Sequence, residues 1–334
     1  MKIIIPMAGR GSRLRPHTLT IPKPLIQVAG KPIVQRLVED LASSYGHPIE
    51  EVAFITGDFG QEVEKDLIRV AEEIGAKGTI YHQTQPLGTA HALLCAADSL
   101  DGNCILAFAD TLFKADFSFN PNDDGVIWVQ KVEDPSAYGV VKTDADGIIT
   151  DFVEKSPVFI SDQAIVGIYY IKDGAYLRSE MQYLIDNNIR DKGEYQLTNA
   201  LENMKRKGTR FRAGHIEEWL DCGNKDALVF ANRRVLEFNK HKKLISETSI
   251  CDNSVIIQPC FIGENVKISN SVIGPFVSIG NNSVINKCVI SNSIIAEKTK
   301  IHHVNMDESM IGNHVDLSGD VPVLSIGDFT KCKL

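Results

Sequence analysis

The sequence predicts an α/β unit followed by a parallel β-helix, and three observations predict this arrangement. Apolar strand-like segments alternate with helical patterns up to about residue 245. Beyond that point the helical period disappears, and short segments rich in Ile and Val recur at a regular interval. The chain has 334 residues, which is long enough for two cores. We therefore expect two domains, residues 1–240 and residues 241–334.

The alternation in the first third of the chain predicts a parallel sheet with helices on both faces. The expected elements are strands at 3–6, 51–57, 78–83 and 104–109 and helices at 33–45, 63–74 and 89–97. Gly46 and Gly75 follow the first two helical patterns, where glycine commonly ends a helix. The segment 104–109 is continuously apolar, as in a strand that is buried on both faces.

Strands dominate from about residue 125 to residue 171. Four are expected, at 126–132, 140–143, 148–153 and 164–171. Asp146-Gly147 separates the second from the third and is a dipeptide typical of a tight hairpin turn. Two helices at 177–185 and 197–204, a further strand, and a helix from about residue 224 complete the unit.

The repeats in the last third of the chain can be aligned with one another. Asn253-Ser254-Val255-Ile256 recurs as Asn270-Ser271-Val272-Ile273, and Ile268 recurs as Ile285 at the same interval. A helix cannot place apolar residues on one face at a spacing of five or six, whereas a triangular solenoid turns them all inward. The sequence therefore predicts about four coils of a hexapeptide-repeat β-helix, which follow a connector at 237–248.

Composition and charge exclude several functional classes. Hydrophobic residues make up 43% and charged residues 23% of the chain, as in a folded globular protein. The net charge of −8 argues against a nucleic-acid partner, and no apolar run reaches the length of about 18 residues that a membrane span needs. The seven cysteines form no C-x-x-C pair, so we expect reduced thiols and a cytoplasmic location.

A glycine-rich loop follows the first strand. In Ala8-Gly9-Arg10-Gly11-Ser12-Arg13 the two glycines permit a tight turn whose backbone N–H groups can bind an anion. Arg13 adds a forked cation, and two prolines fix the backbone around Lys23. These features predict a polyphosphate site. They match neither the P-loop nor the dinucleotide fingerprint, because Gly-Lys-Ser/Thr and a third glycine are missing.

Five ordered motifs resemble the signature of the sugar-1-phosphate nucleotidylyltransferases. They are Ala8–Thr18 with Pro22–Pro24, Gln83–Ala92, Ala109-Asp110, Tyr138–Val141 with Glu154-Lys155, and Trp219–Gly223. The resemblance implies a Rossmann-like mixed-sheet nucleotidyltransferase domain with a left-handed β-helix at its C-terminal side. It also implies the reaction, in which a sugar 1-phosphate oxygen attacks the α-phosphorus of a nucleoside triphosphate and releases pyrophosphate.

The resemblance implies a role for each matched residue. Arg13 and Lys23 are the expected catalytic cations, because two anions must meet in the transition state. Asp110 and Asp221 are the expected ligands of Mg²⁺, a hard cation that prefers oxygen. The expected nucleotide-binding residues are Ala8, Gly9, Gly11, Ser12, Gln83, Pro86, Gly88 and Thr89. The expected sugar-phosphate-binding residues are Tyr138, Gly139, Glu154, Lys155, Gly167 and Lys192.

The base choice depends on Gln83. Its amide carries an acceptor and donors, so we expect it to pair with the N3–H and the O4 of a pyrimidine. UTP or dTTP is therefore favoured, and GTP, as in mannose-1-phosphate guanylyltransferases, is the alternative.

Two further alternatives concern the whole chain. A bifunctional enzyme with acyltransferase activity in the β-helix would use His302, His303 or His314 as a base. A non-catalytic regulatory subunit would typically lack part of the phosphate-binding set, which is complete here. We favour a β-helix that mediates assembly and expect a homo-oligomer, because the open ends and flat sides of a solenoid favour self-association.

Overall fold

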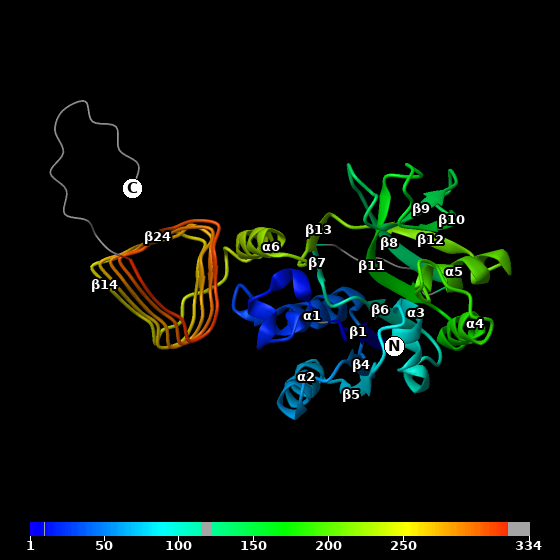
Figure 1. The fold of residues 1–334 in the computed structure, drawn as a ribbon, viewed down its shortest axis with the longest axis horizontal. Coiled ribbons are helices and arrows are strands. Elements are labelled where there is room, and N and C mark those ends of the chain that lie inside the picture. Colours follow the sequence, from blue (N-terminus) through cyan, green and yellow to red (C-terminus); the bar gives the residue numbers. More distant parts are fainter. Residues whose placement is uncertain (10, 115–119, 121, 320–334) are drawn as a thin grey trace. The chain divides into compact units, whose positions relative to one another are not determined.

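The chain forms two compact units in the computed structural model (Figure 1). The structure describes residues 1–334 except 10, 115–119, 121 and 320–334, so Arg10, Cys332 and the end of the expected β-helix domain lie outside the described residues. The first unit contains Met1–Ile26 and Lys31–Ala227, and the second contains Gln27–Gly30 and the chain from Leu228 onward. The last boundary between the two units falls within helix α6 (Lys225–Phe238). The boundary between functional domains that the sequence suggests, at residue 240, stays a prediction.

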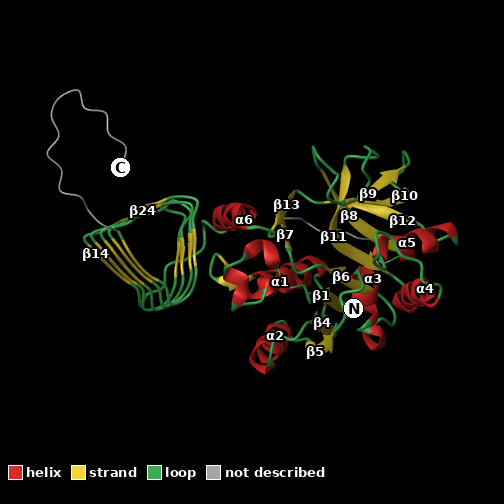
Figure 2. Ribbon diagram, viewed as in Figure 1, coloured by secondary structure: helices red, strands yellow, loops and turns green. Residues whose placement is uncertain are grey.

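The first unit is built on a nine-stranded mixed sheet that helices cover (Figure 2). The strand order is β10-β9-β11-β6-β1-β4-β5, with β8 paired to β11 and β12. The strands are β1 Lys2–Pro6, β4 Glu51–Thr56, β5 Lys77–His82, β6 Cys104–Ala107, β8 Gly125–Lys131, β9 Gly139–Thr143, β10 Ile149–Glu154, β11 Gln163–Ile171 and β12 Phe211–His215. The helices are α1 Ile33–Tyr45, α2 Gln61–Glu73, α3 Thr89–Leu94, α4 Gly174–Asp186 and α5 Leu197–Arg206. The predicted Rossmann-like mixed sheet is confirmed.

The strands β6, β1, β4 and β5 are parallel, as the alternation of strands and helices predicts. β1 lies in the middle, where the fully buried Ile4 pairs with Ala53 on one side and with Leu106 on the other. Figure 1 shows α1 and α2 on one side of these strands and α3 and α4 on the other. Because parallel strands end at the same edge of a sheet, the segments that follow β1, β5 and β6 converge there.

The other strand pairs of the sheet are antiparallel, apart from β8 with β12. β9 and β10 form the predicted hairpin, and Gly147 in its turn has a φ of 76° that suits glycine. A separate antiparallel pair, β7 (Thr111–Lys114) and β13 (Glu218–Asp221), places Asp221 opposite Thr111. The backbone N–H of Cys222 then donates to the carbonyl oxygen of Asp110 at 3.0 Å. This pairing brings the two expected metal ligands together from distant parts of the sequence.

A continuous apolar core joins the helices α3, α4 and α5 to the sheet. Leu93, Leu177 and Leu201 from these helices pack with Ile4 and Leu106 of the central strands, and each is fully buried. Burial of a side chain of this size stabilises a fold by about 1.5–3 kcal/mol. The core therefore holds the strand ends that carry the loops.

The second unit contains a left-handed parallel β-helix of three sheets, β14-β17-β20-β23-β26, β15-β18-β21-β24 and β16-β19-β22-β25. The strands are β14 Ile250–Asp252, β15 Val255–Ile256, β16 Phe261–Ile262, β17 Lys267–Ser269, β18 Val272–Ile273, β19 Ser278–Ile279, β20 Val284–Asn286, β21 Val289–Ile290, β22 Ile294–Ile295, β23 Lys300–His302, β24 Asn305–Met306, β25 Met310–Ile311 and β26 Asp316–Ser318. Ile268, Ile285, Ile301 and Leu317 stand in register, which confirms the alignment of the sequence repeats.

A short segment from the N-terminal part of the chain packs within the second unit. The side-chain oxygen of Asn232 in α6 accepts from the backbone N–H of Ala29 at 2.9 Å and from the hydroxyl of Ser278 at 2.7 Å. Asn232 is fully buried, so these hydrogen bonds offset the cost of taking its amide out of water. A Cβ on Gly30, whose φ is 86°, would lie 2.2 Å from the ring of Phe261. Both α6 and the β-helix therefore hold this segment.

Two expectations from composition concern cysteines and membrane spans. The six described cysteines are free. No helix in the described part of the chain has the length and the apolar character that crossing a membrane requires.

Candidate active site

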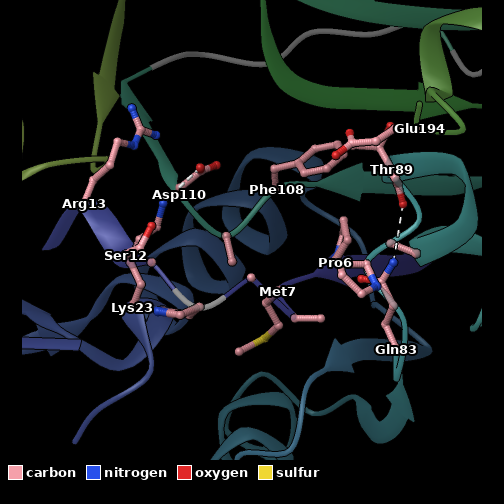
Figure 3. Close-up of a pocket in the computed structure, with 18 residues that line it drawn as sticks. Pro6, Met7, Ser12, Arg13, Lys23, Gln83, Thr89, Phe108, Asp110 and Glu194 are labelled. Carbon is pink, nitrogen blue, oxygen red and sulfur yellow. Dashed lines mark hydrogen bonds and ion pairs between the residues drawn. The ribbon is translucent and has the colours of Figure 1, made fainter. Parts of the chain in front are cut away.

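A cavity of about 400 Å³ lies where the segments after β1, β5 and β6 converge (Figure 3). It is lined by every expected catalytic and nucleotide-binding residue and by Asp110, that is, by Ala8, Gly9, Gly11, Ser12, Arg13, Lys23, Gln83, Pro86, Gly88, Thr89 and Asp110. The other lining residues, which the sequence analysis did not assign, are Pro6, Met7, Pro24, Ala92, Phe108, Ala109 and Glu194. The expected sugar-phosphate residues and Asp221 are not part of this lining.

The glycine-rich loop packs directly against the segment that carries Lys23. Gly11 has a φ of 61°, and a Cβ at this position would lie 2.8 Å from the Cβ of Lys23. The hydroxyl of Thr18 donates to the carbonyl oxygen of Gly11 at 2.8 Å and closes the loop. Glycine at position 11 therefore permits both the left-handed backbone and the close approach of the lysine.

Two cations and two carboxylates meet beside this loop. The ammonium of Lys23, a residue only 9% exposed, lies 2.9 Å from Oδ2 of Asp110. A Cβ on Gly223 would lie 2.9 Å from both Nη2 of Arg13 and Oδ1 of Asp221, so these two side chains flank the glycine. Burial raises the pKa of Asp221, and the neighbouring charge of Asp110 raises it further. The four groups form one charged cluster at the edge of the cavity.

The two carboxylates fit a hydrated divalent cation. Among the described residues no group of three or more His, Cys, Asp or Glu side chains is placed to hold a metal. Mg²⁺ commonly takes only one or two carboxylates and completes its shell with water and substrate phosphates. A cation bound between Asp110 and Asp221 would also offset the repulsion between their two negative charges. This donor set therefore fits Mg²⁺ that binds together with a triphosphate.

The expected sugar-phosphate residues form a second cluster around Glu154. Glu154 pairs with Gly139 across the β9–β10 hairpin, and a Cβ on Gly139 would lie 3.0 Å from its Oε2. The ammonium of Lys155 lies 3.5 Å from Oε1 of Glu154. The ammonium of Lys192 donates to the carbonyl oxygen of Lys155 at 2.7 Å. Lys155 thus stands beside a carboxylate that can accept hydrogen bonds from hydroxyl groups, and Lys192 lies against the Lys155 backbone.

Tyr138 and Gly167 connect this cluster to the charged groups and the cavity. The ring of Tyr138 packs edge-to-face on Trp219, with centroids 5.0 Å apart. Burial raises the pKa of Tyr138, and the charge of Asp221 adds to this effect. The carbonyl oxygen of Gly167 accepts from the backbone N–H of Phe108, a cavity residue, at 3.0 Å.

Two polar residues that the sequence analysis missed support the site. The hydroxyl of Thr198 in α5 donates to Oε2 of Glu154 at 3.2 Å. Glu194 lines the cavity because its segment pairs with the one after Leu87, where Tyr195 exchanges backbone hydrogen bonds with Leu87 and Ala90. The only sequence signal for Glu194 was its position two residues after Lys192, and Thr198 gave none.

Gly88 is the position where a single methyl group should disturb this pairing. Its φ is 115°, and a Cβ would lie 2.4 Å from the backbone oxygen of Tyr195. We expect Gly88→Ala to cost about 1–3 kcal/mol through this collision and about 1–3 kcal/mol through backbone strain, and to weaken nucleotide binding. Thermal unfolding of the whole chain measures the loss.

Gly60→Ala separates the two contributions. Gly60 has a φ of 84°, but apart from its two chain neighbours no described residue has an atom within 4 Å of the position that a Cβ would take there. This variant should lose only the backbone part, about 1–3 kcal/mol, and should bind nucleotide normally. Equal destabilisation of the two variants would contradict the role of the Gly88–Tyr195 contact.

Comparisons with known proteins identify the family to which the chain belongs. The family model described as nucleotidyl transferase matches residues 2–237. A glucose-1-phosphate thymidylyltransferase of Streptomyces antibioticus is 31% identical over 364 aligned positions, which cover 100% of this chain and 99% of the relative. The catalytic subunit beta of mannose-1-phosphate guanylyltransferase from Drosophila pseudoobscura pseudoobscura is 35% identical over 190 positions, 54% of this chain and 50% of the relative.

A solved structure of UDP-glucose pyrophosphorylase in complex with UDP-glucose has the same fold as the matched part of the chain. The TM-score is 0.57 at 23% identity, and the match covers 71% of this chain and 98% of the other. The family match and the full-length relative decide the assignment. The chain therefore belongs to the nucleotidyl transferase family, and its predicted membership of the sugar-1-phosphate nucleotidylyltransferases is confirmed.

Proposed function

We propose that this enzyme transfers the nucleoside monophosphate of UTP or dTTP to a sugar 1-phosphate, with Mg²⁺, and releases pyrophosphate. The observation that carries the proposal is the cavity that collects every expected catalytic and nucleotide-binding residue beside the pair of Lys23 and Asp110. The full-length thymidylyltransferase relative supports the choice of nucleotide. The proposal includes a homo-oligomer in which the β-helix serves assembly.

The chemistry asks the protein mainly to position and neutralise two anions. Lys23 and Arg13 would bind the triphosphate and stabilise the charge that develops at the α-phosphorus. Lys155 and Lys192 would hold the attacking sugar phosphate, while Glu154 accepts hydrogen bonds from sugar hydroxyls. The attacking phosphate oxygen is already ionised at neutral pH, so no general base is needed. Mg²⁺, held by Asp110 and Asp221, would supply further charge neutralisation on the phosphates.

A matrix of nucleotides against sugar 1-phosphates tests the proposal. With pyrophosphate release as the readout, UTP or dTTP should exceed ATP and CTP by at least about tenfold in kcat/KM, because a pocket that hydrogen-bonds a base edge rejects bases that leave its groups unpaired. The same matrix identifies the sugar. Absence of pyrophosphate release with every pair would contradict the proposed reaction.

GTP is the second candidate nucleotide, and one observation favours it. The guanylyltransferase relative is 35% identical to this chain, against 31% for the thymidylyltransferase relative, although it matches only 54% of this chain. A preference of tenfold or more for GTP in the same matrix would replace UTP and dTTP while leaving the reaction class unchanged.

A further inference from the structure

The amide of Gln83 is held on its nitrogen side. Gln83 follows β5 and lines the cavity on the same side as Thr89 (Figure 3). Its Nε2 lies 3.4 Å from the carbonyl oxygen of Gly88 and 3.2 Å from Nδ1 of His91. No hydrogen bond within the described part of the chain engages its Oε1.

Both neighbours of this nitrogen are acceptors. The carbonyl oxygen of Gly88 can only accept a hydrogen bond. His91 stands on α3, and burial lowers its pKa, so the imidazole is neutral at neutral pH and its Nδ1 can accept as well. The two N–H bonds of the amide thus have two acceptors, and a flipped amide would place its oxygen against the Gly88 carbonyl.

We infer that His91 is a positioning residue that orients the Gln83 amide so that its oxygen, and not its nitrogen, faces the base. The inference rests on the proposed function and narrows its substrate class. An acceptor at this place pairs with a base that has an N–H at the centre of its pairing edge, which uracil, thymine and guanine have. Cytosine and adenine present a lone pair there and are repelled.

This orientation also changes the expected contacts of a pyrimidine. From residue type alone, the Gln83 amide is expected to donate to O4 as well as to accept from N3–H. With Nε2 bound to Gly88 and His91, only the acceptor remains for the base. The donor for O4 must then come from another group, and the backbone beside Gly88 borders the same cavity.

UTP and CTP provide the probe pair, because they have the same size and differ only at N3 and C4. Equilibrium binding of each to the whole chain with Mg²⁺ should favour UTP by at least about tenfold in the unchanged protein. His91→Leu removes the acceptor and frees the amide to turn. The ratio of the UTP affinity to the CTP affinity should then lie between about one third and three. His91→Asn keeps an oxygen near the position of Nδ1 and should retain most of the ratio.

Two controls isolate the role of His91. His215→Leu changes an exposed histidine of β12 outside the cavity lining and should leave the ratio unchanged. In a Gln83→Met background the ratio should already be near one, and His91→Leu should not change it further, because the two residues act through one amide. In turnover measurements, His91→Leu should raise the KM for UTP and leave kcat at saturation within about twofold.

Each outcome decides the inference. A folded His91→Leu protein that still favours UTP tenfold over CTP overturns it, as does a His91→Asn protein that loses the ratio to the same extent as His91→Leu. If His91→Leu does not fold, His91→Phe removes the same acceptor with a ring of similar size. A protein that binds no nucleotide and releases no pyrophosphate with any nucleotide contradicts the proposed function instead, and so the two failures are distinguishable.

Discussion

Asp110→Asn and Asp221→Asn should each reduce Mg²⁺-dependent turnover by about 10³-fold or more, because each removes one of two carboxylates in a site that has no third protein ligand among the described residues. Nucleotide binding without metal should persist, since the loop and Lys23 remain. Steady-state pyrophosphate release measures the first effect. Binding of Mn²⁺, followed by its electron paramagnetic resonance signal, measures the loss of the ion without turnover.

Asp98→Asn is the matched control for the carboxylates. Asp98 is exposed and does not line the cavity, so this variant should keep both turnover and Mn²⁺ binding. Full activity of either site variant, or of the unchanged enzyme in EDTA, would contradict the assignment of the metal ligands.

Lys23→Ala should lower kcat/KM by about 10²–10³, the usual cost of losing one preorganised group that stabilises transition-state charge. The structure adds a second expectation. The Lys23 ammonium lies 2.9 Å from Asp110 and competes with a metal ion for that carboxylate. Lys23→Ala should therefore bind Mn²⁺ more tightly in the absence of nucleotide while it binds UTP more weakly.

The opposite directions of these two affinities separate a catalytic role from general damage to the fold, which would weaken both. Lys131→Ala serves as the control, because the Lys131 side chain is 72% exposed and should affect neither affinity. A folded Lys23→Ala enzyme with near-normal turnover would remove Lys23 from the site.

The features that could be predicted from the sequence are those set by residues that lie close together along the chain or that recur at a regular interval. The stacking of Ile268, Ile285 and Ile301 followed from a repeat that is visible along the chain. The glycine-rich loop and Lys23 were also local, because Gly11 and Lys23 are close in the sequence and the prolines hold the lysine in place. Such patterns report backbone geometry directly, and the structure agrees with them.

The remaining features depend on long-range pairing. The β7–β13 pair that joins Asp110 to Asp221 links short segments that are far apart in the sequence, and neither is long enough to show a strand period. Glu194 enters the cavity wall only because its segment pairs with the one after Leu87. The orientation of the Gln83 amide follows from two acceptors that surround it in space. Residue types alone do not contain this information.

The packing of Gln27–Gly30 within the second unit has a consequence for how the protein can be shortened. The chain passes between the units after residues 26, 30 and 227, so no single cleavage separates them. A fragment that ends at residue 227 would contain every expected site residue but would lack the rest of α6 and the Asn232 oxygen to which Ala29 donates. The segment that would lose Asn232 as its partner, residues 27–30, begins only a few residues after Lys23 in the sequence. The β-helix is thus not a detachable module, and exchanging it between relatives would require exchanging residues 27–30 with it.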